Sequence, residues 1–181
     1  SECGAVLDSD VIHGGGTDDT AALQAILDRA KDPAKGVRLI IDGAALIRGL
    51  KVYSNTTIEC MSASCGFYLM DHSDCAVVEN GNERRCGEIE DENITLIGGT
   101  YNQNCANQVH DIPRDDLNGY APSNGLPGFP PSCDPVFDLK FTGVRNLTLR
   151  DLIIRDQRTY AAAFRNWEHV RVENVEIQLP N

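Results

Sequence analysis

A repeat of 23 residues constrains the fold of this chain more than any other feature of the sequence. Residues 137–159 (FDLKFTGVRNLTLRDLIIRDQRT) align with residues 160–181 (YAAAFRNWEHVRVENVEIQLPN), and Phe141 matches Phe164. Each copy holds two short runs in which apolar and polar residues alternate, and alternation with a period of two is typical of β-strands. A fixed period in the twenties is typical of proteins that stack one supersecondary unit on the next.

Earlier segments carry weaker copies of the same unit. "NITLIGGTY" (93–101) aligns with "NLTLRDLII" (146–154), and "NTTIEC" (55–60) is a fainter copy. The segment 105–135 between two copies is rich in Pro, Gly and Asn and has no period, which indicates an inserted loop. A leucine-rich repeat is excluded because its LxxLxLxxN pattern is missing. We therefore predict an all-β fold, a right-handed parallel β-helix with coils of about 23 residues over residues 36–181.

Three Asn-x-Thr sequences begin at Asn55, Asn93 and Asn146. Each could accept an N-linked glycan, but all three fall at the same place in the repeat. An Asn side chain satisfies backbone groups at a sharp corner, and stacked copies can bond to one another. The recurrence favours this structural role.

The segment 1–35 is expected to hold a helix that caps the first coil. Apolar residues recur at helical spacing over residues 18–31, at Leu23, Ile26, Leu27 and Ala30. The preceding "GGGTDDT" could be a phosphate-binding loop, but it lacks the Gly-Lys-Ser/Thr sequence of a P-loop and carries two acidic residues. Thr17, Asp18 and Asp19 are better explained as candidates for the helix N-cap.

Charge and composition narrow the classes of partner. The 181 residues carry a formal net charge of −11, which argues against nucleic acid and anionic membranes as partners. No apolar run approaches the ~20 residues of a membrane-spanning helix. Seven cysteines without a CxxC pair leave two alternatives open, namely reduced thiols or at least one disulfide within residues 60–86.

The opening "CGAVLDSDVIHGGGTDDTAALQAILDRA" resembles the pectate-lyase-like superfamily of right-handed parallel β-helices. Residues 93–104 and 144–180 look like segments of polygalacturonase-type (family 28-like) glycoside hydrolases. The resemblance implies a carbohydrate-active enzyme, a polysaccharide substrate and a secreted or extracellular location. The Asn-x-Asp-Gly, Gly-His-Gly and Arg-x-Lys motifs of those hydrolases are absent. The resemblance therefore implies that the catalytic acids lie after Asn181 in a longer protein and that this chain alone is inactive.

Two alternatives to a hydrolase stay open. The first is a polysaccharide lyase or epimerase of the same fold, which would need a base and often Ca²⁺. Only this alternative involves a metal; for a hydrolase or a binding protein we expect no cofactor or metal. The second alternative is a non-catalytic β-helix that binds glycans or builds an assembly. If the last coil is uncapped, its exposed strand edges predict end-to-end self-association.

Candidate substrate-binding residues follow from the repeat. Asp138 and Lys140 alternate with inward residues and are expected to point outward, while Arg158 and Tyr160 begin the last strand of this kind. Arg can pair with a uronate carboxylate and Tyr can stack on a sugar face. Loop residues that could reach the cleft or bind Ca²⁺, but are more simply explained as solvated, are His110, Asp111, Arg114, Asp115 and Asp116. Trp167 is expected to pack inside, and His169 occupies the Asn corner position.

Overall fold

The computed structural model describes residues 4–82, 88–108, 137–158 and 160–179, and all structural statements below concern these residues. A seven-stranded sheet contains, in spatial order, β1 (Val37–Ile41), β4 (Thr56–Cys60), β7 (Asp91–Ile97), β9 (Phe137–Arg150), β6 (Val78–Asn80) and β3 (Leu50–Val52), with β11 (Tyr160–Glu173) paired to β9. A five-stranded sheet contains β12 (Glu176–Gln178), β10 (Ile153–Arg155), β8 (Thr100–Asn102), β5 (Gly66–Leu69) and β2 (Ala44–Ile47).

Strand pairing in both sheets is parallel, and its register confirms the 23-residue repeat at one end of the molecule. Phe141 pairs with Phe164 in β9 and β11, and Ile154 pairs with Ile177 in β10 and β12. The predicted spacing of 53 residues is also found, because Ile94 of β7 pairs with Leu147 of β9. The strand pattern read from the sequence therefore places these neighbours correctly.

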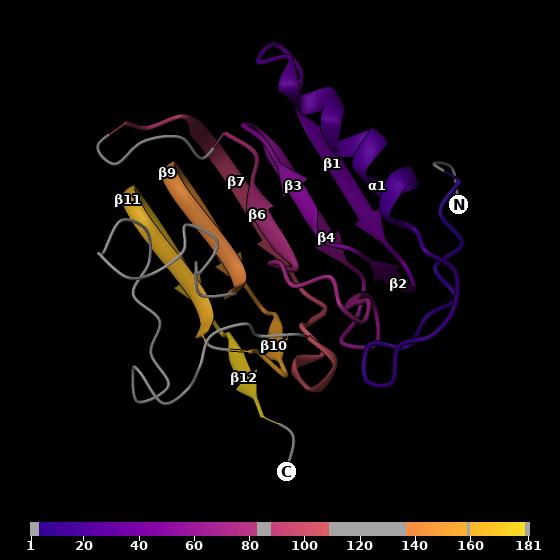
Figure 1. Ribbon diagram of the computed structural model, residues 1–181. Helices are drawn as coiled ribbons and strands as arrows, with labels where there is room; N and C mark the ends of the chain where they lie inside the picture. Colours follow the sequence, from indigo (N-terminus) through magenta and orange to yellow (C-terminus); the bar gives the residue numbers. More distant parts are fainter. Residues whose placement is uncertain (1–3, 83–87, 109–136, 159, 180–181) are drawn as a thin grey trace, which may run out of the picture.

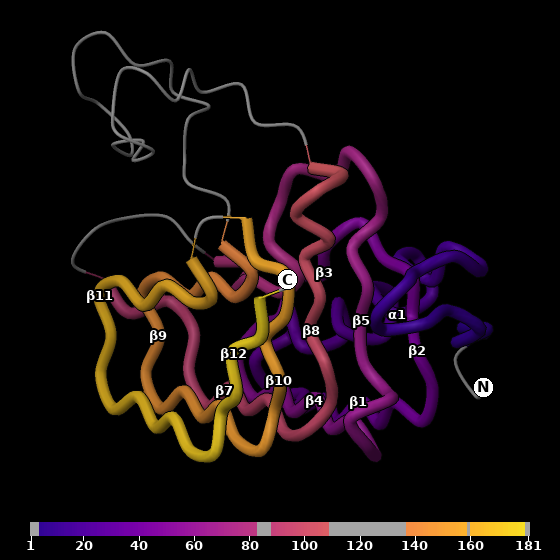
Figure 2. Tube along the Cα trace, turned by 90° about the horizontal axis from the view of Figure 1, so that it is seen from below, coloured from indigo at the N-terminus to yellow at the C-terminus, as the bar shows by residue number. Residues whose placement is uncertain are grey.

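The predicted fold class is wrong. In the described part of the chain, the two parallel sheets curve into a half-barrel with a single short α-helix, α1 (Thr20–Leu27). This is an α/β-type arrangement and not an all-β right-handed β-helix. Figure 2 shows β7, β9 and β11 on one side, with β12, β10, β8, β5 and β2 following one another on the other. A constant spacing holds only for the last pairs, because Val37 pairs with Thr56, 19 residues on, and Thr57 with Thr95, 38 residues on. The prediction applied the 23-residue period to the whole sheet, but the earlier strands β1, β4 and β7 pair at other spacings.

The core lies between the inner faces of the sheets. It contains Phe67 and Tyr101 of the five-stranded sheet, whose ring centroids are 5.3 Å apart, and Leu139 and Phe141 of β9. Each of these side chains is at most 1% exposed. Burying a large apolar side chain contributes about 1.5–3 kcal/mol, so this continuous core is the main source of stability.

Corner residues in the left-handed region allow the chain to turn between strands. Asn55, Asn93 and Asn146 all have φ near +60°, a conformation that Asn tolerates better than most residues. Their side chains form a ladder, in which Asn93 Nδ2 donates to Asn55 Oδ1 at 2.9 Å and Asn146 Nδ2 donates to Asn93 Oδ1 at 3.0 Å. The structural role predicted for these residues is confirmed. His169 follows at the same position with φ 57°, as expected.

Helix α1 continues into a 3₁₀ turn, Asp28–Lys31, so the predicted helix over residues 18–31 is confirmed within two residues at its start. Leu23 and Leu27 are fully buried, and Figure 1 shows α1 beside β1 at one end of the sheet. The glycine-rich segment before it is structural. Asp18 Oδ1 accepts a hydrogen bond from the Thr20 backbone N at 3.0 Å, as a cap would.

Asp19, however, holds the N-terminal segment and makes no cap. Its two carboxylate oxygens accept hydrogen bonds from the backbone N of Val6 at 2.6 Å and of Leu7 at 2.9 Å. Asp19 is only 2% exposed, and its backbone N donates to the Leu46 carbonyl of β2 at 2.9 Å. One residue therefore joins the N-terminal segment, α1 and the five-stranded sheet.

Four cysteines in the described part of the chain are free thiols, namely Cys60, Cys65, Cys75 and Cys105. Cys3, Cys86 and Cys133 lie outside the described residues, as does most of the predicted insert 105–135. Within the described ranges, no helix is long and apolar enough to cross a membrane.

The two ends of the molecule differ in what they expose. The first end is covered by α1, whereas β11 and β12 each pair with one described neighbour. Large apolar side chains are exposed on or after these strands, including Trp167 (55%), Val172 (50%) and Ile177 (57%). The expectation that Trp167 packs inside is therefore wrong, although it does pair in register with Val144.

We expect Asp19→Asn to lower the free energy of unfolding by about 2 kcal/mol. The backbone N–H groups of Val6 and Leu7 each need one acceptor oxygen, and an amide supplies only one oxygen in total. Asp18→Asn is the matched control, since Asn still caps a helix and Asp18 is exposed, so its effect should be within about 0.5 kcal/mol. Urea unfolding measures both. Equal destabilisation by the two substitutions would contradict the role given to Asp19.

We also expect the chain to self-associate through β11 and β12, because strand edges with no partner among the described residues and exposed apolar side chains favour pairing with a second copy. Together these strands carry two Arg and three Glu, which leaves the end close to neutral in a chain of net charge −11. The double substitution Val172→Lys with Ile177→Lys should give a monomer in light scattering after size exclusion. A wild-type chain that stays monomeric over a wide concentration range would refute this.

Candidate functional site

An aromatic pair with a neighbouring arginine lies at the start of β9 and β11. The rings of Phe137 and Tyr160 stack with centroids 5.6 Å apart and planes inclined by 25°. The guanidinium carbon of Arg165 lies 5.5 Å from the centroid of the Phe137 ring. Phe137 is buried, but Tyr160 is 43% exposed. We call Phe137, Tyr160 and Arg165, with Arg158, the aromatic platform.

Arg158 is held next to this platform by two hydrogen bonds. Its backbone N donates to Gln103 Oε1 at 2.6 Å, and its Nη1 donates to the Cys105 carbonyl at 3.0 Å. Gln103 is fully buried, and its Nε2 donates to the Phe137 carbonyl at 2.9 Å. A buried amide therefore ties Arg158, two residues before β11, to the first residue of β9. The structure brings the predicted residues Arg158 and Tyr160 together.

Lys140 lies on the outer face of the seven-stranded sheet, as predicted. It pairs in register with Glu79 of β6 and Ala163 of β11. Glu79 in turn lies beside Lys51 of β3, whose Nζ is 3.4 Å from Glu79 Oε1. Lys140 is three residues along β9 from Phe137, which is about 10 Å in a strand. Because side chains alternate along a strand, Lys140 points to the opposite face of β9 from Phe137 and lies outside the platform.

Asp138 is not at the surface, contrary to the prediction. Its side chain is fully buried, and neither carboxylate oxygen has a hydrogen-bond partner among the described residues. Burial raises its pKa well above the ordinary value, and the nearby charge of Asp156 adds to the shift. Alternation along a strand says which face a residue lies on, but not whether that face is covered there. Asp138 is therefore excluded as an exposed substrate ligand.

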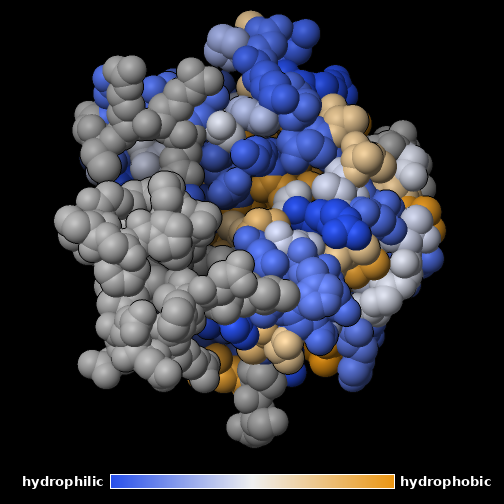
Figure 3. All heavy atoms as spheres, viewed as in Figure 1, coloured by the Kyte–Doolittle hydropathy of each residue, from blue (hydrophilic) through white to orange (hydrophobic). Residues whose placement is uncertain are grey.

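The platform carries two guanidinium groups, those of Arg158 and Arg165, within an acidic protein. Arg165 lies by the Phe137 ring and Arg158 lies two residues before Tyr160, while burial raises the pKa of Asp138 well above its ordinary value. The face seen in Figure 3 is mostly hydrophilic where residues are described, with apolar residues in small patches. A negatively charged ligand is therefore accepted more readily here than over most of a chain of net charge −11.

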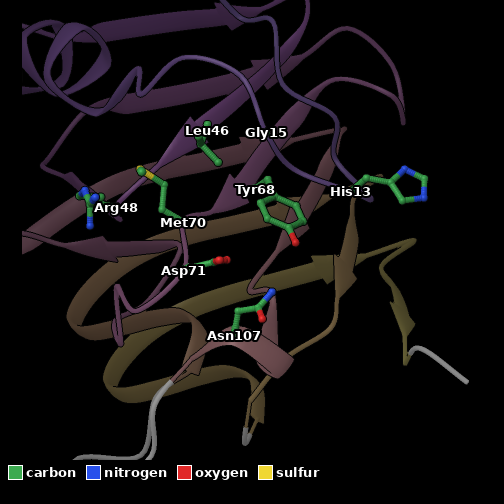
Figure 4. A pocket seen from close by; sticks show the side chains of 8 residues that line it. All are labelled: His13, Gly15, Leu46, Arg48, Tyr68, Met70, Asp71 and Asn107. Carbon is green, nitrogen blue, oxygen red and sulfur yellow. The ribbon is translucent and has the colours of Figure 1, made fainter.

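A second hollow of about 420 Å³ lies on the five-stranded sheet (Figure 4). Its apolar part consists of Leu46, Tyr68 and Met70, and its polar part of His13, Arg48, Asp71 and Asn107. Gly15 also lines it. Sequence analysis missed this pocket, because its residues come from segments far apart in the chain. The glycine run contributes to its wall, since a Cβ on Gly14 would lie 2.4 Å from Tyr68 Cε1.

Three of the described thiols are poorly suited to act as nucleophiles. Burial raises the pKa of Cys60 to about 12 and that of Cys75 to about 11. Burial and a hydrogen bond to Asp156 raise the pKa of Cys105 to about 11. All three are protonated at neutral pH and are therefore poor nucleophiles.

Within the described ranges no group of three or more His, Cys, Asp and Glu side chains could hold a metal ion. The predicted loop candidates His110, Asp111, Arg114, Asp115 and Asp116 lie outside these ranges.

Comparisons with known proteins relate the chain to others by fold alone. No family model matches it, and no curated protein matches it. A crystal structure from Parabacteroides merdae ATCC 43184, described as "a putative glycosyl hydrolase", is similar with a TM-score of 0.63 and 17% sequence identity. The match covers 97% of this chain and 71% of that one. The similarity supports a fold like that of the Parabacteroides merdae protein. It does not show that the chain belongs to the pectate-lyase-like superfamily.

The buried Asp138 predicts a specific pH dependence of stability. Below pH 3.8, the ordinary pKa of Asp, the carboxyl is protonated in both the folded and the unfolded chain and costs nothing. Above it, the unfolded chain loses the proton first, so the free energy of unfolding falls by up to about 1.4 kcal/mol per pH unit until the folded pKa is reached.

Asp138→Asn removes this dependence. The variant should match the wild-type protein near pH 4 and be more stable than it at pH 7 by urea unfolding. Asp42→Asn, at an exposed position, is the control and should follow the wild-type protein at every pH. If the stability of Asp138→Asn relative to wild type does not rise with pH, Asp138 is ionised in the folded protein and our assignment is wrong.

Proposed function

We propose that this protein is a carbohydrate-active protein of the polygalacturonase-like glycoside hydrolase type, and that it binds an acidic polysaccharide at the aromatic platform. The observation that carries the proposal is the exposed Tyr160, stacked on Phe137 and flanked by Arg158 and Arg165. The fold similarity to a protein described as a glycosyl hydrolase supports the carbohydrate class. The acidic substrate is inferred from the side chains alone.

The chemistry of a uronate matches these groups. One face of a sugar ring carries C–H groups that pack on an aromatic ring, while the hydroxyls and the carboxylate point away from it. A guanidinium presents two parallel N–H donors to a carboxylate. The Phe137 ring beneath Tyr160 and the Gln103 amide behind Arg158 limit the motion of both contact residues. Little conformational entropy is then lost on binding.

The platform also explains how an acidic protein can bind a polyanion. Arg158 and Arg165 give it charged donors, but the net charge of −11 opposes the approach of the ligand. Binding should therefore be weak to moderate. Because the contacts are between exposed charges, added salt should weaken it.

Tyr160→Ala is expected to weaken binding to polygalacturonate about tenfold, which corresponds to the loss of about 1.4 kcal/mol of contact free energy. Trp167→Ala is the matched control, because Trp167 is an exposed aromatic residue on the same strand but outside the platform. Isothermal titration calorimetry with oligogalacturonides measures both variants. A reducing-end assay on the same samples should show that this chain does not cleave the ligand that it binds.

Two results would overturn the proposal. The first is wild-type protein that does not bind oligogalacturonides, or binds their fully methyl-esterified forms equally well. The second is a Trp167→Ala variant that loses as much affinity as Tyr160→Ala.

A further inference from the structure

The pocket on the five-stranded sheet is separate from the aromatic platform and has different chemistry. It lies over β2 and β5, between the N-terminal segment and the turn that contains Asn107. Its volume of about 420 Å³ is within the ~300–1,000 Å³ of pockets that bind small molecules. Three polar side chains converge in Figure 4: the Tyr68 hydroxyl, the Asp71 carboxylate and the Asn107 amide.

Each of these groups is positioned by contacts that leave polar atoms for a ligand. Asn104 Nδ2 donates to Asp71 Oδ1 at 2.8 Å, and Asn107 Nδ2 donates to Asn104 Oδ1 at 2.9 Å. No hydrogen bond with described residues is found for Asp71 Oδ2 or Asn107 Oδ1. Burial raises the pKa of Tyr68, and the charge of Asp71 adds to the shift, so the phenol keeps its proton as a donor. The pocket thus offers one hydroxyl donor beside two oxygen acceptors.

The N-terminal wall of the pocket is fixed as well. Asp10 Oδ1 accepts hydrogen bonds from the backbone N of Ile12 at 2.7 Å and of His13 at 2.9 Å. Gly14 follows with φ +69° and lies so close to the Tyr68 ring that a Cβ there would be 2.4 Å from it. The backbone therefore closes against the ring in a way that requires glycine.

We infer that this pocket binds a neutral sugar through two neighbouring hydroxyl groups. The apolar floor of Leu46, Tyr68 and Met70 suits the C–H face of a pyranose or furanose ring. Asp71 and Asn107 accept hydrogen bonds from adjacent hydroxyls, and the Tyr68 phenol donates to one of them.

Charge argues for a neutral ligand here and against a uronate. Arg48, the cation at the rim, has its Nε 3.4 Å from Asp18 Oδ2, so its charge is already balanced. Asp71 then leaves the rim with an excess negative charge that would repel a carboxylate. The pocket and the platform would therefore recognise different parts of a mixed polysaccharide, one neutral and one acidic.

The test is a titration followed by NMR on protein with isotope-labelled tyrosine, using galactose, rhamnose, arabinose, xylose and galacturonate as separate probes. We expect a saturable shift of the Tyr68 signal with at least one neutral sugar and none with galacturonate at the same concentrations. Asp71→Asn should weaken binding of that sugar at least tenfold, because it replaces the acceptor Oδ2 by an amide donor. Asp74→Asn, an exposed neighbouring acid that does not line the pocket, should leave it unchanged.

The result is independent of the platform. Tyr160→Ala should not alter sugar binding at Tyr68, so failure of the proposed function and failure of this inference are distinguishable. The inference is overturned if no neutral sugar gives a saturable shift, if galacturonate binds as tightly, or if Asp71→Asn binds like the wild-type protein while remaining folded in a thermal melt.

Discussion

Parallel pairing in register is the constraint on which the rest of this structure depends. Each strand covers the inner side chains of the strand before it, so Phe141 of β9 stacks on Phe164 of β11 with ring centroids 6.5 Å apart. Backbone bonds and apolar contacts thus run in the same direction, from β1 toward β11. At the first end α1 buries Leu23 and Leu27 against the core. Asp19 secures that closure through Val6, Leu7 and Leu46.

The same pairing builds both candidate binding surfaces. The aromatic platform exists because the first residues of β9 and β11 pair, which places Tyr160 on Phe137. The pocket exists because β2 and β5 pair, which brings Leu46 next to Tyr68. The short turn Cys105–Asn107 lies between the two, since Arg158 bonds to its first carbonyl and Asn107 lines the pocket. A glycan with neutral and acidic sugars could therefore contact both surfaces on one protein.

Local features were predictable from the sequence, and their combination was less so. The 23-residue register, the Asn55–Asn93–Asn146 ladder and the helix over 18–31 follow from periodicity and side-chain chemistry, which act over short distances. The fold class was wrong because the spacing of the last strands was applied to earlier ones, where the loops between strands differ in length. Asp138 was placed outside because alternation cannot reveal what covers a strand. The pocket could not be predicted, since Gly15, Tyr68 and Asn107 meet only through the tertiary structure.

The central claim is that an acidic glycan lies across the aromatic platform. The most direct measurement is a crystal structure of this chain with an oligogalacturonide. We expect a galacturonate ring over Tyr160, with its carboxylate within hydrogen-bonding distance of Arg158 or Arg165. An oligosaccharide bound elsewhere on the protein, or a platform without sugar at saturating concentration, would contradict it.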